Sequence, residues 1–204
     1  MKKQGLNIFL IAVLMFSMIF SCKDDDDVDT LQDHDNNKMM SLLNAMNKSL
    51  DSLTMTLDPD NDFALMMRVH HKGAINMGNL ELKEGSDPTL RQMATEMNAR
   101  QKKEIEKLDS FLLVHPPSKN ESRFHLEAEK AMKRMNNNAN LQILNGNADH
   151  DFAILMIQHH QGAIDMADLE IRFGNSDGLK VMAEMMKEDQ QKGIKDFQEW
   201  LLYR

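Results

Sequence analysis

The sequence predicts an all-α protein, a four-helix bundle built from two duplicated helical hairpins with additional flanking helices. Aromatic residues make up only 5% of the chain, and long stretches are rich in Leu, Met, Ala, Glu, Lys and Gln, which favour helices. No stretch alternates between apolar and polar residues as a strand would. The segments LMMRVHHKGAINMGNLEL, from Leu65, and LMIQHHQGAIDMADLEI, from Leu155, align without a gap at an offset of 89 residues. Two related structural units are therefore expected.

The first unit is expected to begin with a helix over residues 39–57. Leucine and methionine side chains recur there at spacings of three and four, which places them on one helix face. The Asp58-Pro59 dipeptide should end this helix, because the residue before a proline disfavours the α conformation.

Two further helices complete the first unit. The second is expected to start after Asp62, whose side chain can cap free backbone amides, and to run to residue 84 with Gly85 as its stop. The third should start at Pro88, a favoured residue of the first turn, and reach about Val114.

The second unit repeats this plan, with helices expected over about residues 121–144, 152–173 and 178–202. The predicted repeats span residues 39–115 and 120–204. Short connections make the second and third helices of each repeat an antiparallel hairpin, and two such hairpins form a four-helix bundle. The leading helix of each repeat should pack outside this bundle or extend it.

Residues 1–21 have the features of a lipoprotein signal peptide. A pair of lysines precedes an apolar run over residues 6–20, which is short for a membrane span. The run leads to Cys22, the only cysteine, in a loose version of the bacterial lipobox, so this residue is expected to carry a lipid. Residues 22–38 would then form a lipidated acidic tether. An uncleaved anchor helix over residues 6–20 is the less favoured alternative.

The tether and the net charge bear on location and partners. A run of four aspartates after Cys22 resembles the acidic tag of surface-exposed bacterial lipoproteins. A cell-envelope protein that is lipid-anchored to the outer membrane is therefore expected, displayed at the surface or, alternatively, at the periplasmic face. The formal net charge is −8, and it becomes −10 without the two lysines of the signal peptide. Such a protein has no electrostatic footprint for nucleic acid.

The paired histidines of each repeat point in two directions on their helix. At about 100° per residue, Met77 lies at roughly −20° and Glu81 at roughly +20° from His70, so these side chains share one stripe. His71 lies about 100° further round, next to Met67 at roughly 60°. Adjacent histidines therefore cannot readily chelate one ion, and each repeat offers a core-facing set and a seam-facing pair. The candidate metal ligands in the two repeats are His70, His71, Met67, Met77, His159, His160, Met156 and Met166.

The helix after each histidine motif carries further candidates at a spacing of four. These additional candidate ligands are Met93, Met97, Met182 and Met186. Candidates for a supporting role are Met66, Glu81, Glu170, Gln101 and Gln190. The two glutamates either orient an imidazole or reach solvent at the end of the bundle, and the second interpretation is favoured.

The density of thioethers and imidazoles favours a soft metal ion. The chain has 19 methionines, three of them in the signal peptide, and eight histidines. Methionine sulfur suits Cu(I) and Ag(I), whereas imidazole suits Cu(I), Cu(II) and zinc. Copper, as Cu(I) or Cu(II), is the expected ion, with silver as an alternative and zinc less favoured.

The sequences MMRVHHKGAINM and LMIQHHQGAIDM, each followed by a helix that contains glutamine, resemble the CopM-like family, long catalogued as a domain of unknown function. The resemblance covers about residues 60–112 and 150–202. It implies a ferritin-like helical bundle, export from the cytosol, and binding of copper or silver in support of copper tolerance. One departure concerns the symmetry of the repeats: Glu104 keeps an acidic residue that is common in the family, whereas Gly193 replaces it in the second repeat.

Other interpretations of these residue types stay open. Methionines at helical spacing often fill cores, and this is expected for Met46, Met55, Met132 and Met135. Inward histidines are often hydrogen-bonded core residues. The histidines outside the motif are expected to be solvated; these are His34, His115, His125 and His150. Glu121 and Glu129 flank His125 at a spacing of four, which makes this group a weak candidate for a harder ion.

Three classes of function follow. Metal capture for tolerance or handover is favoured. A structural or partner-binding surface lipoprotein without metal is the alternative. A ferritin-like redox enzyme is less favoured, because no histidine follows Glu81 or Glu170 by three residues as in di-iron bundles. No catalytic residue is assigned, and no nucleophile triad, P-loop or Rossmann signature occurs. Methionine-rich outer faces are compatible with a homodimer, and the sequence identifies no delivery partner.

Overall fold

The computed structural model describes residues 31–118 and 121–203. The predicted signal peptide, Cys22 and most of the acidic tether lie outside these residues. The helices are η1 (His34–Asn36), α1 (Lys38–Asp51), α2 (Pro59–Glu84), α3 (Pro88–Val114), α4 (Ser122–Asn140), α5 (Ala148–Phe173) and α6 (Asp177–Leu202). The described chain contains helices and no strands, so the all-α prediction is confirmed. Across these residues, no helix combines the length and apolarity needed to cross a bilayer.

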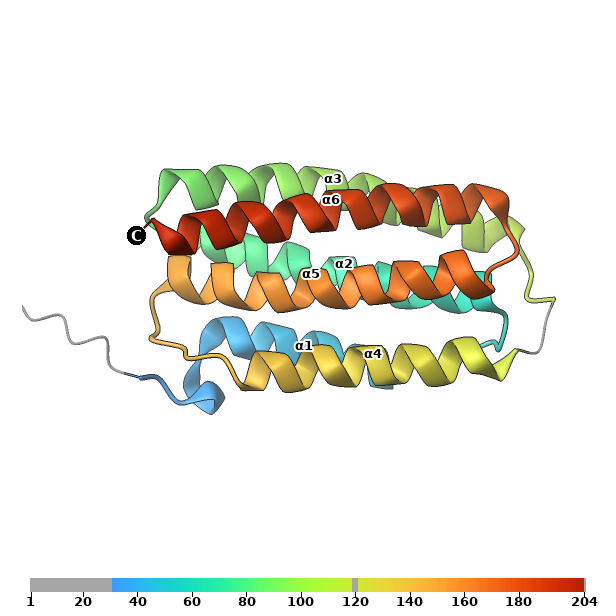
Figure 1. Ribbon diagram of the computed structural model, residues 1–204, viewed down its shortest axis with the longest axis horizontal. Coiled ribbons are helices and arrows are strands. Elements are labelled where there is room, and N and C mark those ends of the chain that lie inside the picture. The colour runs from blue at the N-terminus through green and yellow to red at the C-terminus, as the bar shows by residue number, and fades with distance from the viewer. Residues whose placement is uncertain (1–30, 119–120, 204) are drawn as a thin grey trace, which may run out of the picture.

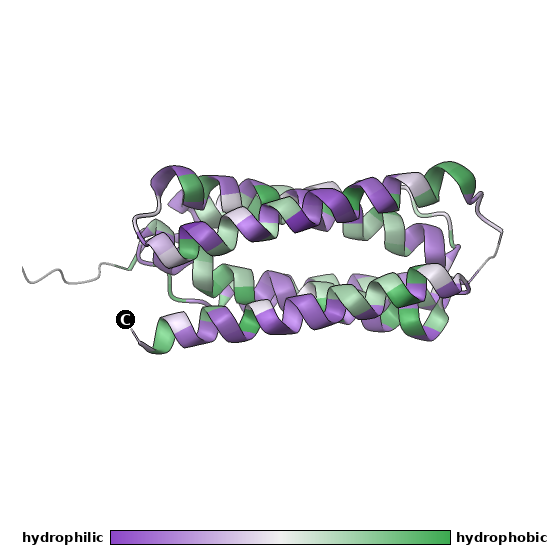
Figure 2. Cartoon of the chain, turned by 90° about the horizontal axis from the view of Figure 1, so that it is seen from above, coloured by the Kyte–Doolittle hydropathy of each residue, from purple (hydrophilic) through white to green (hydrophobic). Residues whose placement is uncertain are grey.

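The six long helices form three layers of two (Figure 1). Helices α3 and α6 make one outer layer, α2 and α5 the middle layer, and α1 and α4 the other outer layer. Viewed from above, the helices fall into two rows, one for each repeat, and each helix carries both hydrophilic and hydrophobic residues (Figure 2). The hairpins α2–α3 and α5–α6 form the predicted bundle, while α1 and α4 cover its open side. The two motif helices, α2 and α5, are therefore enclosed on both sides.

The predicted start of the second helix was four residues too late. Asp58 caps α2 by accepting a hydrogen bond from the Asn61 amide at 3.1 Å, and Pro59 occupies the first turn. Asn147 caps α5 in the same way through the amide of His150 at 3.0 Å, so this helix starts at residue 148 instead of 152. The Asp58-Pro59 dipeptide, which was predicted to end the leading helix, therefore marks the start of α2.

The leading helices end earlier than predicted, α1 at Asp51 instead of residue 57 and α4 at Asn140 instead of 144. The cause is the same in both repeats. The carboxylate of Asp62 accepts the amides of Thr56 at 2.7 Å and Leu57 at 3.1 Å. The carboxylate of Asp151 accepts the amides of residues 145 and 146 at 3.1 and 3.0 Å. Asp62 and Asp151 therefore hold loops in place rather than cap helices.

The two repeats are related by an approximate twofold axis. Asn47 donates a hydrogen bond to Asn136 at 2.8 Å, and these residues are 89 positions apart. Two of the described residues have a positive φ, Leu57 at 63° and Gly146 at 81°, and these two are also 89 positions apart. The duplication that is visible in the motif therefore extends to the leading helices and their loops.

Each repeat anchors the other through a buried aspartate. Asp60 of α2 accepts the amides of Asn175 and Ser176 at 2.8 and 2.9 Å, just before α6. Asp149 of α5 accepts the amides of residues 86 and 87 at 3.0 and 2.9 Å, just before α3. Each carboxylate therefore satisfies backbone groups of the opposite repeat, which ties the two ends of the bundle together.

Replacing Asp60 or Asp149 with Ala should lower the free energy of unfolding by about 2–3 kcal/mol, because charge-assisted hydrogen bonds to backbone amides are lost. Urea denaturation followed by circular dichroism measures this effect. The matched control is Asp168→Ala, which removes an exposed carboxylate paired with Lys187 and should change stability by at most about 0.5 kcal/mol. Equal effects at Asp60 and Asp168 would contradict the proposed anchoring role.

Candidate metal centre

The four motif histidines lie at the centre of the middle layer. All of them are at most 1% exposed. The rings of His70 and His159 pack against each other with centroids 3.7 Å apart and planes tilted by 34°. His159 and His160 have centroids 6.0 Å apart. The folding of α2 against α5 thus brings the histidines of both repeats into one buried cluster.

Few of the imidazole nitrogens have a partner. Nε2 of His159 lies 3.0 Å from the carbonyl oxygen of His70, and Nε2 of His71 lies 2.8 Å from a carboxylate oxygen of Glu104. Among the described residues, no hydrogen-bond partner is present for Nδ1 of any of the four histidines or for Nε2 of His70. Buried polar atoms without a partner are costly and uncommon. Several lone pairs or N–H groups in this cluster are therefore available to a ligand.

Two glutamines add to this set. The side-chain amides of Gln101 on α3 and Gln190 on α6 are completely buried, and neither oxygen nor nitrogen finds a partner in the described part of the chain. Each lies one turn before a residue that touches the cluster: Glu104 contacts His71, and the backbone of Gly193 lies against His160. The outer helices therefore also direct unpartnered polar groups into the same layer.

Burial keeps the imidazoles neutral. Desolvation, followed by repulsion from His159, holds the pKa of His70 well below its ordinary value. Desolvation lowers the pKa of His159 to about 3, and it also lowers the pKa of His160, with a further contribution from His159. At neutral pH these side chains carry a free lone pair, which is the form that binds metals.

The predicted methionine ligands occupy the same core. Met67, Met77, Met156 and Met166 are fully buried, and Met97 and Met186 nearly so. Met93 and Met182 are half-buried at its edge. The structure thus places thioethers from α2, α3, α5 and α6 in the core that also contains the histidine cluster.

Two methionines expected to be core filler, Met46 and Met135, pack directly on glycines of the motif helices. A Cβ atom at Gly162 would lie 2.6 Å from Sδ of Met135 and 3.3 Å from Nε2 of His70, so sulfur and imidazole converge on one glycine. In the other repeat, Sδ of Met46 packs directly on Gly73. The sequence contained a signal for this pair, because Met46 and Met135 are also 89 residues apart. Glycine at both positions leaves the space that the thioethers occupy.

The favoured prediction that Glu81 and Glu170 reach solvent was wrong. Both side chains are fully buried. Glycine at positions 85 and 174 makes room for them, since a Cβ there would collide with the carboxyl oxygens. Desolvation and a hydrogen bond with Asp149 raise the pKa of Glu81 to about 8, and desolvation with a hydrogen bond to Asp60 raises that of Glu170 to about 9. Both glutamic acids are therefore protonated at neutral pH. Glu81 donates a hydrogen bond to Asp149, and Glu170 donates one to Asp60.

One side of the cluster is open. Glu104 covers His71, but the equivalent position beside His160 is Gly193. A small opening of about 50 Å³ lies there, and its lining includes buried His160 together with exposed Glu96 and Lys192. The thioethers of Met93 and Met97 also line it. The second repeat therefore offers a path from the surface to an imidazole that the first repeat closes.

The histidines outside the motif are less solvated than predicted. Nε2 of His34 lies 2.9 Å from the carbonyl oxygen of Gln142, and Nδ1 of His150 lies 3.1 Å from Asp151. His115 stacks on Phe111 with ring centroids 4.5 Å apart. All three are half-buried and contribute to capping and packing at the ends of helices.

A further group of possible ligands was not predicted. Asp58, Asp60 and His115 place one ligand atom each within 4.8 Å of the others. Both carboxylates already accept backbone amides, Asp58 from Asn61 and Asp60 from Asn175. These hydrogen bonds explain the aspartates without an ion.

A family described as Domain of unknown function (DUF305) matches residues 60–201. The chain belongs to this family. Membership of a family catalogued as a domain of unknown function is thereby confirmed, and the matched residues cover nearly all of the four bundle helices, whereas α1 precedes them. No curated protein and no solved structure matches the chain. The description of the DUF305 family names no ligand.

Proposed function

We propose that this protein binds a soft metal ion, Cu(I) in the first place, at the histidine cluster between α2 and α5, and that it captures copper in the cell envelope for tolerance or handover. The observation that carries the proposal is the set of fully buried imidazoles whose Nδ1 atoms have no partner within the described residues. A protein core does not usually keep such groups unless they are used.

The donor set fits this ion. Neutral imidazole and thioether ligands suit Cu(I) and Ag(I), and Cu(II) is accommodated by imidazole alone. His70 and His159 would supply nitrogen, and Met135 is the methionine whose sulfur converges with His70 on Gly162. The carboxylate of Glu104 would orient His71, as carboxylates commonly orient metal-bound imidazoles. Zinc is less favoured because thioethers are poor ligands for it.

A second function is supported by one contact. The hydrogen bond between His159 and the carbonyl of His70 shows that these rings also join the two repeats. A structural or partner-binding lipoprotein, anchored through Cys22, would use the histidines only in this way. A role as a redox enzyme is not proposed.

The test is a competition titration of the purified protein with Cu(I) and the chelator bicinchoninate under anaerobic conditions. The variant His70→Ala, His71→Ala, His159→Ala, His160→Ala should bind at least about 100-fold more weakly, because it lacks the nitrogen ligands. The matched control is His34→Ala, His115→Ala, His150→Ala, which removes three histidines outside the cluster and should bind as the wild type does. Equal affinity of the wild-type and cluster variants would contradict the proposal.

A milder double variant distinguishes loss of metal ligands from loss of binding that is caused by unfolding. His70→Gln and His159→Gln keep a hydrogen-bonding side chain of similar length but replace the imidazoles, and circular dichroism should show unchanged helicity. Weak Cu(I) binding by this folded pair would support the metal site. Retained binding would support the structural role of the two rings.

A further inference from the structure

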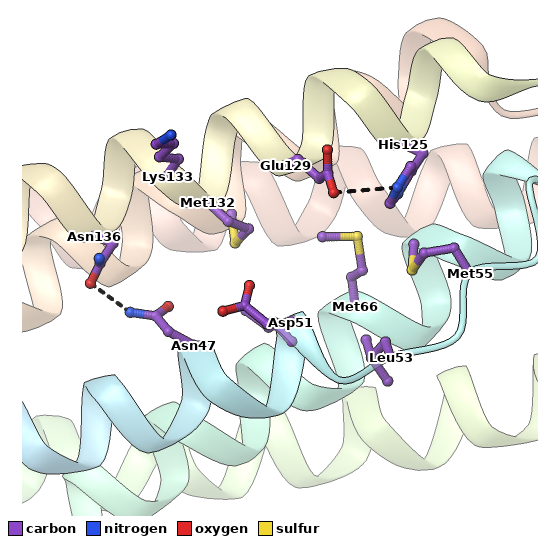
Figure 3. A pocket seen from close by; sticks show the side chains of 11 residues that line it. Asn47, Asp51, Leu53, Met55, Met66, His125, Glu129, Met132, Lys133 and Asn136 are labelled. Carbon is purple, nitrogen blue, oxygen red and sulfur yellow. Dashed lines mark hydrogen bonds and ion pairs between the residues drawn. The ribbon is translucent and has the colours of Figure 1, made fainter.

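A pocket of about 720 Å³ lies between α1 and α4, and none of the four motif histidines is among the residues that line it (Figure 3). Its walls also include the loop after α1 and one face of α2. The match to the DUF305 family begins at residue 60, so the wall formed by α1 and its loop lies outside the matched part of the chain. The pocket is thus built partly from residues that belong to this protein rather than to the family domain.

Three thioethers and one imidazole line this pocket. They belong to Met55 in the loop, Met66 on α2, and Met132 and His125 on α4. His125 and Met132 are seven residues apart, so they share one face of α4. Figure 3 shows Met55, Met66 and His125 directed toward the same end of the pocket. Methionine has three rotatable bonds, and the open volume lets the thioethers move toward a common ion.

One ring nitrogen of His125 has a partner, and the other has none within the described residues. Its Nε2 lies 3.4 Å from a carboxylate oxygen of Glu129. Its Nδ1 is buried and has no partner in the described part of the chain. A carboxylate that contacts one ring nitrogen leaves the other available as a ligand. Asp51 and Glu129 also line the pocket and outnumber its one lysine, Lys133, which favours a cation.

The region related to this pocket by the approximate twofold axis shows that methionine is not needed here for packing. At the offset of 89 residues, Met55, Met66 and Met132 pair with Leu144, Leu155 and Leu43, and His125 pairs with Asn36. The three leucines are at most 1% exposed and fill the core of the equivalent region. Leucine therefore satisfies the fold at these positions. The thioethers and the imidazole occur together only on the side where the pocket is found.

We infer that this pocket is a second metal site, which binds a soft monovalent cation, Cu(I) or Ag(I), through the sulfurs of Met55, Met66 and Met132 and Nδ1 of His125. Three neutral thioethers with one imidazole select a soft cation over zinc or calcium. The site shares no proposed ligand nitrogen with the histidine cluster, so it stands or falls independently of the proposed function.

The test uses Ag(I), a redox-stable ion with the ligand preference of Cu(I), and protein labelled with carbon-13 at the methionine methyl groups. The methyl resonances of Met55, Met66 and Met132 should shift together as Ag(I) is added and should reach a plateau at the same Ag(I) concentration. The variant Met55→Leu, Met132→Leu, His125→Asn carries the residues of the other repeat, so it should fold normally. It should bind one Ag(I) fewer per chain, and its Met66 methyl should no longer respond.

The two metal proposals give different outcomes. The variant with four alanines in the histidine cluster should keep the response of Met55, Met66 and Met132. Unchanged methyl resonances of these residues in the wild-type protein would overturn the pocket site, and so would full Ag(I) stoichiometry in the leucine variant. Either of these results would leave the histidine cluster untouched, because the cluster is tested by its own variants.

Discussion

Replacing Gly193 with Glu is expected to slow the loading of Cu(I) at least about tenfold. A Cβ atom at this position would lie 2.6 Å from both Nε2 and Cδ2 of His160, and the carboxylate would fill the opening that leads to this imidazole. The change copies the first repeat, in which Glu104 covers His71. Stopped-flow absorbance of a Cu(I)–bicinchoninate complex, mixed with metal-free protein, measures the rate of transfer.

Two variants frame this result. Gly178→Glu places the same charge on α6 at an exposed glycine with open space around it, and it should load at the wild-type rate. Glu104→Gly opens the first repeat and should accelerate loading. If Gly193→Glu transferred copper as fast as Gly178→Glu, with circular dichroism showing both to be folded, the opening would not be the route of access.

Stability is expected to peak near pH 6.5 and to fall on both sides by several kcal/mol. On the alkaline side, Glu81 and Glu170 have folded-state pKa values of about 8 and about 9, above their ordinary value of 4.5. The folded state therefore holds protons that the unfolded state releases, and stability decreases as the pH rises from about 4.5 through these values. Each buried carboxyl should contribute on the order of 3 kcal/mol to this loss.

The acidic side has the opposite sign. The pKa values of His70, His159 and His160 are lowered by burial, so the unfolded state takes up protons that the folded state refuses. Stability from these groups is complete above about pH 6.5 and is lost as the pH falls toward about 3. The buried histidines lower stability at acidic pH and the buried glutamic acids lower it at alkaline pH, so the pH range of maximum stability is narrow.

Urea denaturation of the metal-free protein at intervals from pH 5 to pH 9 tests this profile. Glu81→Gln with Glu170→Gln should flatten the alkaline side, because an amide keeps the donor of a protonated carboxyl and cannot ionise. The control Glu106→Gln changes an exposed residue of α3 and should leave the profile unchanged. An alkaline decline that persists in the double glutamine variant would show that other groups cause it.

Much of this fold could be read from the sequence because the protein is duplicated. Gap-free alignment of the histidine motifs predicts two repeats, and the glycine and proline signals place α3 correctly at Pro88–Val114. The errors arise where distant segments decide local structure. Asp62 was predicted to cap a helix, but Asp62 and Asp151 bind the preceding loops, which shortens α1 and α4.

The candidate site was predicted in part. Helical spacing gives the direction of a side chain around the helix axis but not how deeply the side chain is buried. The spacing therefore pointed to the histidines, but it placed Glu81 and Glu170 wrongly in solvent. Their burial depends on Asp149 and Asp60 of the opposite repeats, which no local pattern reveals. The proximity of Met135 to His70 likewise depends on how α4 packs on α5.

The most direct measurement is anomalous X-ray diffraction at the copper edge from crystals grown with Cu(I) under anaerobic conditions. A strong anomalous peak between α2 and α5, within bonding distance of a nitrogen of His70 or His159, is the predicted result. Anomalous peaks confined to surface residues would contradict the proposal that this cluster binds copper. A structure from crystals grown with Cu(I) in which the four imidazoles bond only to protein atoms would contradict it as well.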